Sequence, residues 1–276
     1  MKKSSPQKLA LCIGINDYPY SGSDLSGCIN DVNDWAKLFK ANGFSVQKLT
    51  NKDATRQNIL EAIGAMVSVA EKGDSLLLQY SGHGSYVPDI NADEPDGTDE
   101  CICPYDMRTR GPITDDELYQ IFASKKNGVK LVFFSDSCHS GTVSRYAPIG
   151  TPSTTGKSNA PQRKVRFLPP ENFLSAGQLR QLGRLRGFGR TSAPGRYGCL
   201  LMSGCMDPEY SYDAWFNNRP NGAFTYVALA TIKKLKAGAT YSDWFNAIRK
   251  LLPSQQYPQS PNLYGSEAMR KWKIFS

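Results

Sequence analysis

Short apolar runs alternate with stretches of helical periodicity through the first half of this chain, and that alternation limits the folds open to it. Four apolar runs have the length and composition of buried strands: Lys8–Asn16, Ser45–Leu49, Asp74–Tyr80 and Lys130–Ser135. Three stretches between them gather apolar side chains on one helical face: Cys28–Ala41, Thr55–Ala70 and Thr114–Ala123. Strands that alternate with helices predict a parallel sheet with helices on both faces.

The second half resumes this pattern after a long interruption. A fifth strand is predicted over Tyr197–Ser203, and helices are predicted over Ala223–Leu235 and Ser242–Leu251. Residues 139–197 are rich in Ser, Pro, Gly and Arg, show little periodicity, and exceed the usual loop length of ~12–15 residues. We expect a single domain over residues 1–276, because an α/β chain of this length can bury one full core.

Reactive side chains follow two of the predicted strands. The third strand runs into residues 80–84 (Tyr-Ser-Gly-His-Gly), and the fourth runs into residues 136–141 (Asp-Ser-Cys-His-Ser-Gly). In a parallel α/β sheet the carboxyl ends of the strands meet at one edge, where ligands bind. We therefore expect His83 and Cys138 to lie together. A thiol beside an imidazole is the arrangement that nucleophilic catalysis needs.

Each of these residues alone also fits a structural role, since a cysteine after a buried strand is most often a core thiol. The chain has only two histidines, however, and both lie in these glycine-containing motifs. His139 is the alternative base, but it directly follows Cys138, and adjacent side chains of an extended chain point to opposite sides. The joint pattern favours His83 and Cys138 as a catalytic pair.

The two motifs resemble those of the caspase-fold cysteine peptidases, and among them the metacaspases and the prokaryotic orthocaspases. The 55 residues that separate His83 from Cys138 are close to the ~50 typical of that clan. The sequence departs from the animal caspases at residues 136–137, where Asp-Ser replaces their Gln-Ala. The resemblance implies a three-layer α/β/α sandwich around a mostly parallel six-stranded sheet.

The resemblance also divides the chain into three parts. Residues 1–140 correspond approximately to the large caspase subunit, and residues 197–276 correspond to the small subunit. Between them, residues 141–196 form an Arg-rich linker that we expect to be flexible.

Roles for individual residues follow from the same resemblance. Cys138 would be the nucleophile and His83 the base that later protonates the leaving amine, while the backbone amides of Gly84 and Cys138 hold the oxyanion. Four residues match the family's pocket for the residue before the scissile bond: Cys28, Asp31, Ser81 and Asp136. Two carboxylates in one pocket would favour Arg or Lys as that residue. Without the resemblance, Asp31 is explained equally well as a charge partner of a helix N-terminus.

The positive charge of the chain is concentrated in the linker. The net charge is +8, and residues 145–198 alone hold ten basic side chains and one acidic one. We expect the linker to occupy the acidic pocket and to be cut there, in cis or in trans. The candidate cleavage sites are Arg163, Lys164, Arg166, Arg180, Arg184, Arg186, Arg190 and Arg196. The alternative is a solvated loop without a regulatory role.

Acidic residues are dense in another part of the chain. Metacaspases often require calcium, and Asp99, Asp115 and Asp116 match three ligands of such a site. Arg145 stands where a fourth carboxylate is expected, and this argues against a calcium switch because its charge would compete with the ion. Asp115 and Asp116 are explained equally well as caps of the helix that begins near Thr114. The peptidase chemistry itself needs no cofactor.

These observations predict a cysteine endopeptidase that cleaves after Arg or Lys and processes its own linker. The alternative is a catalytically silent caspase-like scaffold or regulatory protein, which the intact pair of His83 and Cys138 argues against. Nucleic-acid binding through the linker is a third class of function, but aromatic residues are sparse there and no known module surrounds them.

The cysteines and the N-terminus indicate the compartment. Seven cysteines without a framework spacing indicate reduced thiols, and no zinc-type cluster accompanies them. No secretion signal and no stretch of ~20 apolar residues is found. We therefore expect a cytoplasmic protein that acts on polypeptides and binds neither nucleic acid nor membrane. The resemblance to metacaspases implies a monomer.

Overall fold

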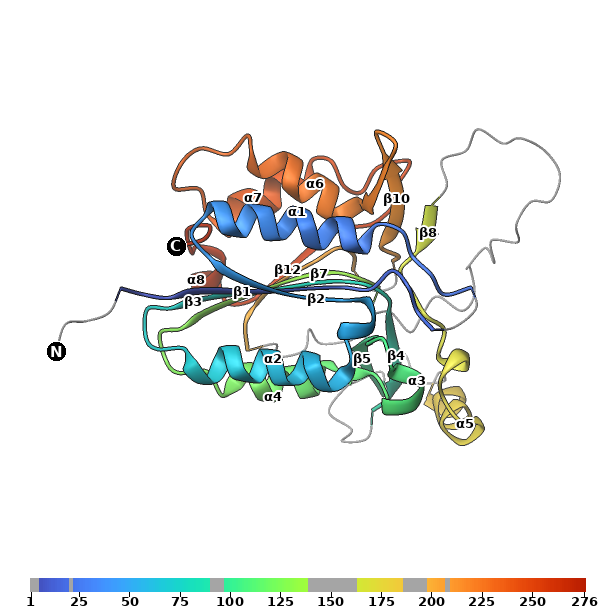
Figure 1. The fold of residues 1–276 in the computed structure, drawn as a ribbon. Helices are drawn as coiled ribbons and strands as arrows, with labels where there is room; N and C mark the ends of the chain where they lie inside the picture. The colour runs from blue at the N-terminus through green and yellow to red at the C-terminus, as the bar shows by residue number, and fades with distance from the viewer. Residues whose placement is uncertain (1–4, 20–21, 90–96, 139–162, 186–197, 207–208) are drawn as a thin grey trace.

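A six-stranded sheet forms the centre of the computed structural model, which describes residues 5–19, 22–89, 97–138, 163–185, 198–206 and 209–276 (Figure 1). The strands lie in the order β12-β9-β7-β3-β1-β2. They are β1 (Lys8–Gly14), β2 (Ser45–Thr50), β3 (Ser75–Ser81), β7 (Lys130–Asp136), β9 (Leu200–Ser203) and β12 (Asn262–Tyr264). All neighbouring strands are parallel except β12, which runs antiparallel to β9. The mostly parallel sheet expected from the sequence is confirmed.

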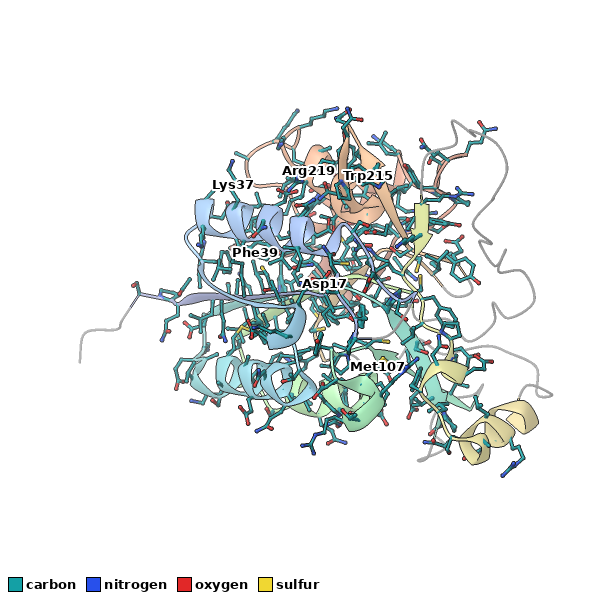
Figure 2. All side chains as sticks on the ribbon, turned by 45° about the vertical axis from the view of Figure 1, so that its right-hand side comes forward. Asp17, Lys37, Phe39, Met107, Trp215 and Arg219 are labelled. Atoms are coloured by element: carbon teal, nitrogen blue, oxygen red, sulfur yellow. The ribbon has the colours of Figure 1, made fainter. Side chains whose placement is uncertain are left out.

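Helices cover both faces of this sheet and complete a three-layer sandwich (Figure 1). One face carries α1 (Cys28–Ala41), α6 (Ala223–Ile232) and α7 (Tyr241–Arg249), and the other carries α2 (Arg56–Val69) and α4 (Asp115–Ala123). The main core accordingly has two parts, one beneath each helical layer, and a smaller third cluster surrounds Tyr212 and Tyr257. On α1, Phe39 is buried between the helix and the sheet, whereas Lys37 lies on the exposed side of the same helix (Figure 2).

Threonine side chains begin three of these helices. Thr55 accepts a hydrogen bond from the amide of Asn58 at the start of α2. Thr114 and Thr240 each form a capping box, in which the threonine and the acidic residue three positions later satisfy each other's backbone amides. Because these caps satisfy amides that have no partner within the helix, they fix where α2, α4 and α7 begin.

Two small sheets lie at the carboxyl ends of the parallel strands. The first contains β4 (Gly84–Pro88), β5 (Thr98–Ile102) and β6 (Ile113–Thr114). The second contains β8 (Arg163–Val165), β10 (Tyr212–Phe216) and β11 (Arg219–Gly222). The remaining short elements are η1 (Asn51–Asp53), α3 (Met107–Arg110), η3 (Pro170–Asn172), α5 (Ala176–Leu185) and α8 (Glu267–Arg270).

The structure differs from the sequence expectation within the Arg-rich linker. Every strand and helix that the sequence predicts is present, with ends that differ by three residues or fewer. Residues 163–185, expected to be flexible, instead form β8, η3 and α5. The strand β8 is only three residues long and pairs with β10, which is far away in the sequence. A strand this short, stabilised by a distant partner, has no periodic sequence pattern that would predict it. Among the described residues, no helix is both long enough and apolar enough to span a bilayer.

Candidate active site

Two strand ends converge on a single oxygen atom. The carbonyl oxygen of Arg166 accepts hydrogen bonds from the backbone amides of Gly84, at 3.0 Å, and Cys138, at 3.2 Å. Gly84 follows His83 after β3, and Cys138 follows β7, which is the neighbouring strand in register with Ser81 opposite Asp136. A Cβ atom on Gly84 would overlap the carbonyl group of Cys138, so only glycine permits this approach. The structure thus brings the two sequence motifs together.

The imidazole of His83 is held with one nitrogen free of hydrogen bonds. Its Nε2 lies 2.7 Å from the carbonyl oxygen of Ser23. A carbonyl oxygen can only accept, so Nε2 carries the proton and Nδ1 of the neutral ring carries a lone pair. Within the described part of the chain, Nδ1 is buried and makes no hydrogen bond. Burial lowers the pKa of His83 to about 4, so the ring is neutral at pH 7 and can accept a proton.

The backbone around His83 is fixed by two tyrosines. The amide of His83 donates to the hydroxyl of Tyr18 at 3.0 Å, and the hydroxyl of Tyr80 donates to the carbonyl of His83 at 2.6 Å. The ring of Tyr18 lies 4.8 Å from the imidazole, centroid to centroid. These contacts hold the position of His83 without a carboxylate. The alternative base, His139, lies outside the described residues.

The thiol of Cys138 is fully buried and contacts the backbone of Ser211. The amide of Ser211 donates to Sγ at 2.8 Å, and the thiol can donate to the carbonyl oxygen of Ser211 at 3.5 Å. The sequence analysis did not identify Ser211, because a contact made through the main chain leaves no mark in the residue type.

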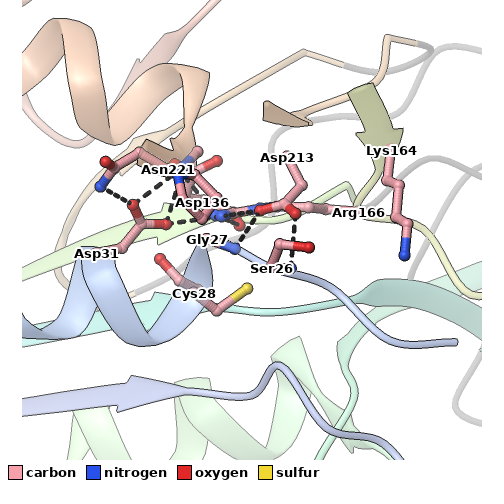
Figure 3. A network of polar contacts seen from close by, with 12 residues as sticks. Ser26, Gly27, Cys28, Asp31, Asp136, Lys164, Arg166, Asp213 and Asn221 are labelled. Carbon is pink, nitrogen blue, oxygen red and sulfur yellow. Dashed lines mark hydrogen bonds and ion pairs between the residues drawn. The ribbon is translucent and has the colours of Figure 1, made fainter. Parts of the chain in front are cut away.

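Three carboxylates surround the guanidinium of Arg166 in a pocket beside these residues (Figure 3). Nitrogen–oxygen distances are 2.7 Å to Asp31 in α1, 3.3 Å to Asp136 at the end of β7, and 2.9 Å to Asp213 in β10. The Arg166 side chain is completely buried, and the three aspartates are at most 3% exposed. Burial lowers the pKa of the guanidinium, but the carboxylates, Asp136 foremost, raise it well above its ordinary value, so Arg166 is fully charged.

Other parts of the protein hold each carboxylate in place. Asp213 accepts from the amides of Ser26 and Gly27, and Asp136 accepts from the amide and hydroxyl of Thr225. Asp31 accepts from the side chain of Asn221 and the amide of Gly222. Burial raises the pKa of Asp31 to about 7, while the positive charge of Arg166 opposes that rise. A pocket so fixed is preorganised for a buried cation.

The four residues expected in this pocket have different surroundings. Asp31 and Asp136 contact the guanidinium directly, and Cys28 lies beside Asp31 in the first turn of α1 (Figure 3). Burial raises the pKa of the Cys28 thiol, although the charge of Arg166 opposes the rise. Ser81 is buried in β3, opposite Asp136, and its hydroxyl accepts a hydrogen bond from Gln79.

The sequence analysis missed Asp213 and Asn221. Asp213 lies in β10, a strand of five residues whose partners are β8 and β11, and Asn221 lies at the end of that sheet in β11. The sequence signal was weak, since Asp213 is a lone acid between aromatic residues. Only its place after the fifth strand, as a further acid able to join Asp31 and Asp136, marks it in the sequence.

The segment around Arg166 is bound in an extended conformation along its whole length. Residues Arg163–Val165 pair with β10 as an antiparallel strand, and the amide of Arg166 donates to the carbonyl of Ser211 at 3.0 Å. Beyond Arg166, the amide of Leu168 donates to the carbonyl of Gly84 at 3.0 Å. An extended peptide added to a strand edge, with one side chain in a deep pocket, is a known mode of peptide recognition.

Two other basic residues of the linker make contacts of their own. The Arg163 guanidinium covers the ring of Tyr212 at 5.1 Å, and Lys164 donates to the carbonyl of Asp24 at 2.8 Å. Arg180 is exposed on α5, and Arg184 lies on the same helix. The other three candidates lie outside the described residues: Arg186, Arg190 and Arg196. Of the candidates that the structure describes, Arg166 is the one whose side chain lies in the acidic pocket.

Comparison with known proteins decides the family. A family model described as "Caspase domain" matches residues 7–272. The chain belongs to this caspase family. It is 35% identical to Metacaspase-1 of Cryptococcus neoformans var. neoformans serotype D, over 95% of this chain and 63% of that protein. It is 33% identical to Metacaspase-1 of Arabidopsis thaliana, over 88% of this chain and 64% of that protein.

The solved structures agree with this caspase-family assignment. A protein from Geobacter sulfurreducens has a TM-score of 0.72 at 32% identity, covering 98% of this chain and 99% of that one. Caspase-1 from Spodoptera frugiperda has a TM-score of 0.59 at 14% identity, which shows a shared fold. The chain spans less than two thirds of the length of the two metacaspases above. The resemblance drawn from the two motifs is confirmed as a metacaspase-like member of the caspase fold.

The acidic residues expected to bind calcium lie on neighbouring elements, since β5 pairs with β6 and α4 follows β6 directly. Asp99 lies in β5, and Asp115 and Asp116 lie in the first turn of α4. The cap of that helix is Thr114, so the two acids complement the helix dipole and are not caps. Among the described residues, no three acids, histidines or cysteines are grouped to hold a metal ion, and Arg145 lies outside them. The calcium site therefore stays a prediction, and no step below uses the ion.

Proposed function

We propose that this chain is a cysteine endopeptidase that cleaves after Arg or Lys and cuts its own chain between Arg166 and Phe167. One observation carries the proposal. The carbonyl oxygen of Arg166 accepts from two backbone amides, one of them that of Cys138, while its side chain fills a pocket of three carboxylates. This is how the residue before a scissile bond is held by a peptidase.

The acylation step that we propose uses His83 as the base and Cys138 as the nucleophile. His83 accepts the thiol proton of Cys138 at Nδ1, and the thiolate attacks the carbonyl carbon of Arg166. The amides of Gly84 and Cys138 bind the oxygen as it becomes negative. The protonated imidazole then gives its proton to the nitrogen of Phe167, the peptide bond breaks, and the Arg166 carbonyl remains on sulfur as a thioester.

Hydrolysis of the thioester completes the reaction. A water molecule attacks the same carbonyl carbon while His83 accepts one of its protons. The thiolate of Cys138 leaves and is protonated by the imidazole, and Arg166 becomes a C-terminal carboxylate. The low pKa of His83 keeps the ring neutral while Arg166 occupies the pocket, so Nδ1 is able to accept a proton.

The preference for Arg or Lys rests on charge. A buried pocket with three aspartates stabilises a cationic side chain and repels an acidic one. Arg gains more than Lys because the two terminal nitrogens of its planar fork reach different acids. One nitrogen of Arg166 lies near Asp136, and the other contacts Asp31 and Asp213.

The tethered segment makes self-cleavage the first reaction. A short tether supplies an effective concentration on the order of mM, which a free substrate seldom matches. While Arg166 remains in the pocket, no other cation can enter it, because the side chain is completely buried. We therefore expect the uncut chain to process itself before it cleaves other polypeptides.

The test compares four full-length proteins by denaturing gel and intact mass. The wild type should yield fragments 1–166 and 167–276, and Cys138→Ala should remain uncut. Arg166→Gln should remove that cleavage point, whereas Arg180→Gln, an exposed residue of the same linker, should be cut like the wild type. A wild type that stays intact and cleaves no Arg or Lys peptide would instead support the scaffold alternative.

A further inference from the structure

The residue after the proposed scissile bond contacts two aromatic side chains. The ring of Phe167 is stacked on Tyr86, with centroids 6.0 Å apart and planes at 17°. It also meets Tyr210, with centroids 6.3 Å apart and planes at 53°. Both distances lie within the range of favourable aromatic pairs. Tyr86 belongs to β4 and Tyr210 precedes β10, so both small sheets contribute to this contact.

The backbone on both sides of Phe167 is fixed, and this fixes the direction of its ring. Arg166 is held by the amides of Gly84 and Cys138, and Leu168 by the carbonyl of Gly84. The hydroxyl of Ser85 also donates to the carbonyl of Leu168 at 2.6 Å. Residue 167 forms a parallel bridge with Gly84, so its position relative to β4 is the same for any side chain.

We propose that Tyr86 and Tyr210 form a subsite that selects an aromatic residue immediately after the scissile bond. The inference rests on the proposed endopeptidase function and adds a second determinant to the pocket for Arg or Lys. A side chain without a ring would keep the backbone contacts and lose both aromatic contacts. Each pair of rings contributes enough to change a rate constant by about two- to tenfold.

The test uses self-processed full-length enzyme and two internally quenched peptides. Both carry the residues Arg-Lys-Val-Arg before the bond and Leu-Pro-Pro in the later positions, and they differ only in Phe or Ala after it. We expect kcat/KM for the Phe peptide to exceed that for the Ala peptide by about four- to hundredfold, from two ring contacts. Equal values for the two peptides would overturn the inference while leaving the endopeptidase proposal intact. If neither peptide is cut, the endopeptidase proposal itself fails.

Enzyme variants assign the preference to the two rings. Tyr210→Ala should lower the ratio of the two kcat/KM values by about two- to tenfold, because the contact with Tyr86 remains. Tyr86→Phe should keep the ratio because it keeps the ring. Tyr119→Ala, which alters a half-exposed tyrosine on α4, is the matched control and should keep the ratio of the wild type. A ratio that survives Tyr210→Ala would remove Tyr210 from the subsite.

The same preference should appear within the intact chain. The Phe167→Tyr variant should cleave itself at nearly the wild-type rate. Self-cleavage of the Phe167→Ala variant should be slower, by the same factor that separates the kcat/KM values of the two peptides. Half-times are measured on freshly translated protein by denaturing gel. Equal half-times for both variants would contradict the inference in cis.

Discussion

At the scale of single residues, position 84 of the candidate active site tolerates no side chain. Its amide points at the carbonyl oxygen of Arg166, and any side chain would overlap the backbone of Cys138. We expect Gly84→Ala to displace this amide and slow self-cleavage by about 100-fold or more, the usual effect of losing one oxyanion donor. Gly64→Ala, on the open side of α2, is the control and should be processed normally. Normal processing of Gly84→Ala would show that the amide is dispensable.

The buried His83 makes a second residue-level prediction, on stability. Its pKa is about 4 in the folded protein, against ~6.5 when unfolded. Between these values the unfolded chain binds a proton that the folded chain does not, so the free energy of unfolding falls as pH drops from 6.5 to 4. The full contribution is roughly 3 kcal/mol, and His83→Gln should remove it.

This stability difference is measured in the Cys138→Ala background, which prevents self-cleavage. Urea unfolding at pH 7 and pH 4.5 gives the loss for each protein, and the loss should be smaller by roughly 2 kcal/mol when His83→Gln is added. Asp31 titrates in both proteins, so the difference between them isolates His83. Equal losses would mean that His83 is accessible to protons in the folded state.

At the scale of elements, the proposed function makes the strand β10 the template for substrate backbone. It pairs with Arg163–Val165 before the chain enters the pocket. A peptide aldehyde Arg-Lys-Val-Arg should therefore inhibit the processed enzyme more strongly than Val-Arg aldehyde. We expect about a tenfold difference in inhibition constant, because the shorter compound loses the strand pairing and the contact of Arg163 with Tyr212. Equal inhibition constants would show that β10 adds nothing to binding.

The elements also show why sequence reasoning succeeded in one place and failed in another. The parallel strands and their helices bury long periodic faces, so local pattern and tertiary structure agree, as α1 at Cys28–Ala41 illustrates. The positions of His83 and Cys138 follow from the same pattern, since both lie at strand ends. The strands β8 and β10 are three and five residues long and are ordered by each other. Asp213 was missed because its role exists only once that pairing has formed.

At the scale of the whole molecule, the proposed cleavage would divide the chain without dividing the fold. The strand β9 follows residue 166 in sequence, yet it lies between β7 and β12 in the sheet with all four of its residues buried. Fragments 1–166 and 167–276 should therefore elute together at the volume of the uncut protein and separate only in denaturant. Size-exclusion chromatography before and after processing checks this. Separation of the fragments in native buffer would contradict it.

The pocket depends on that association as well. Asp31 and Asp136 belong to the first fragment and Asp213 belongs to the second. Neither fragment alone contains the full set of charges that surround Arg166. Activity toward Arg peptides should therefore require both pieces, and mixing them after separate refolding should restore it in proportion to reassociation.

The extended course of residues 163–168 limits which proteins this enzyme could cut. Six residues in an extended conformation span roughly 20 Å. The backbone amides and carbonyls on both sides of this segment must form hydrogen bonds with the enzyme. Folded proteins rarely leave such a length of main chain unpaired and accessible. Disordered tails and long loops contain such accessible segments, and so does a substrate protein that heat or damage has partly unfolded. Local unfolding of the substrate protein would thus decide where it is cut as much as the presence of an arginine.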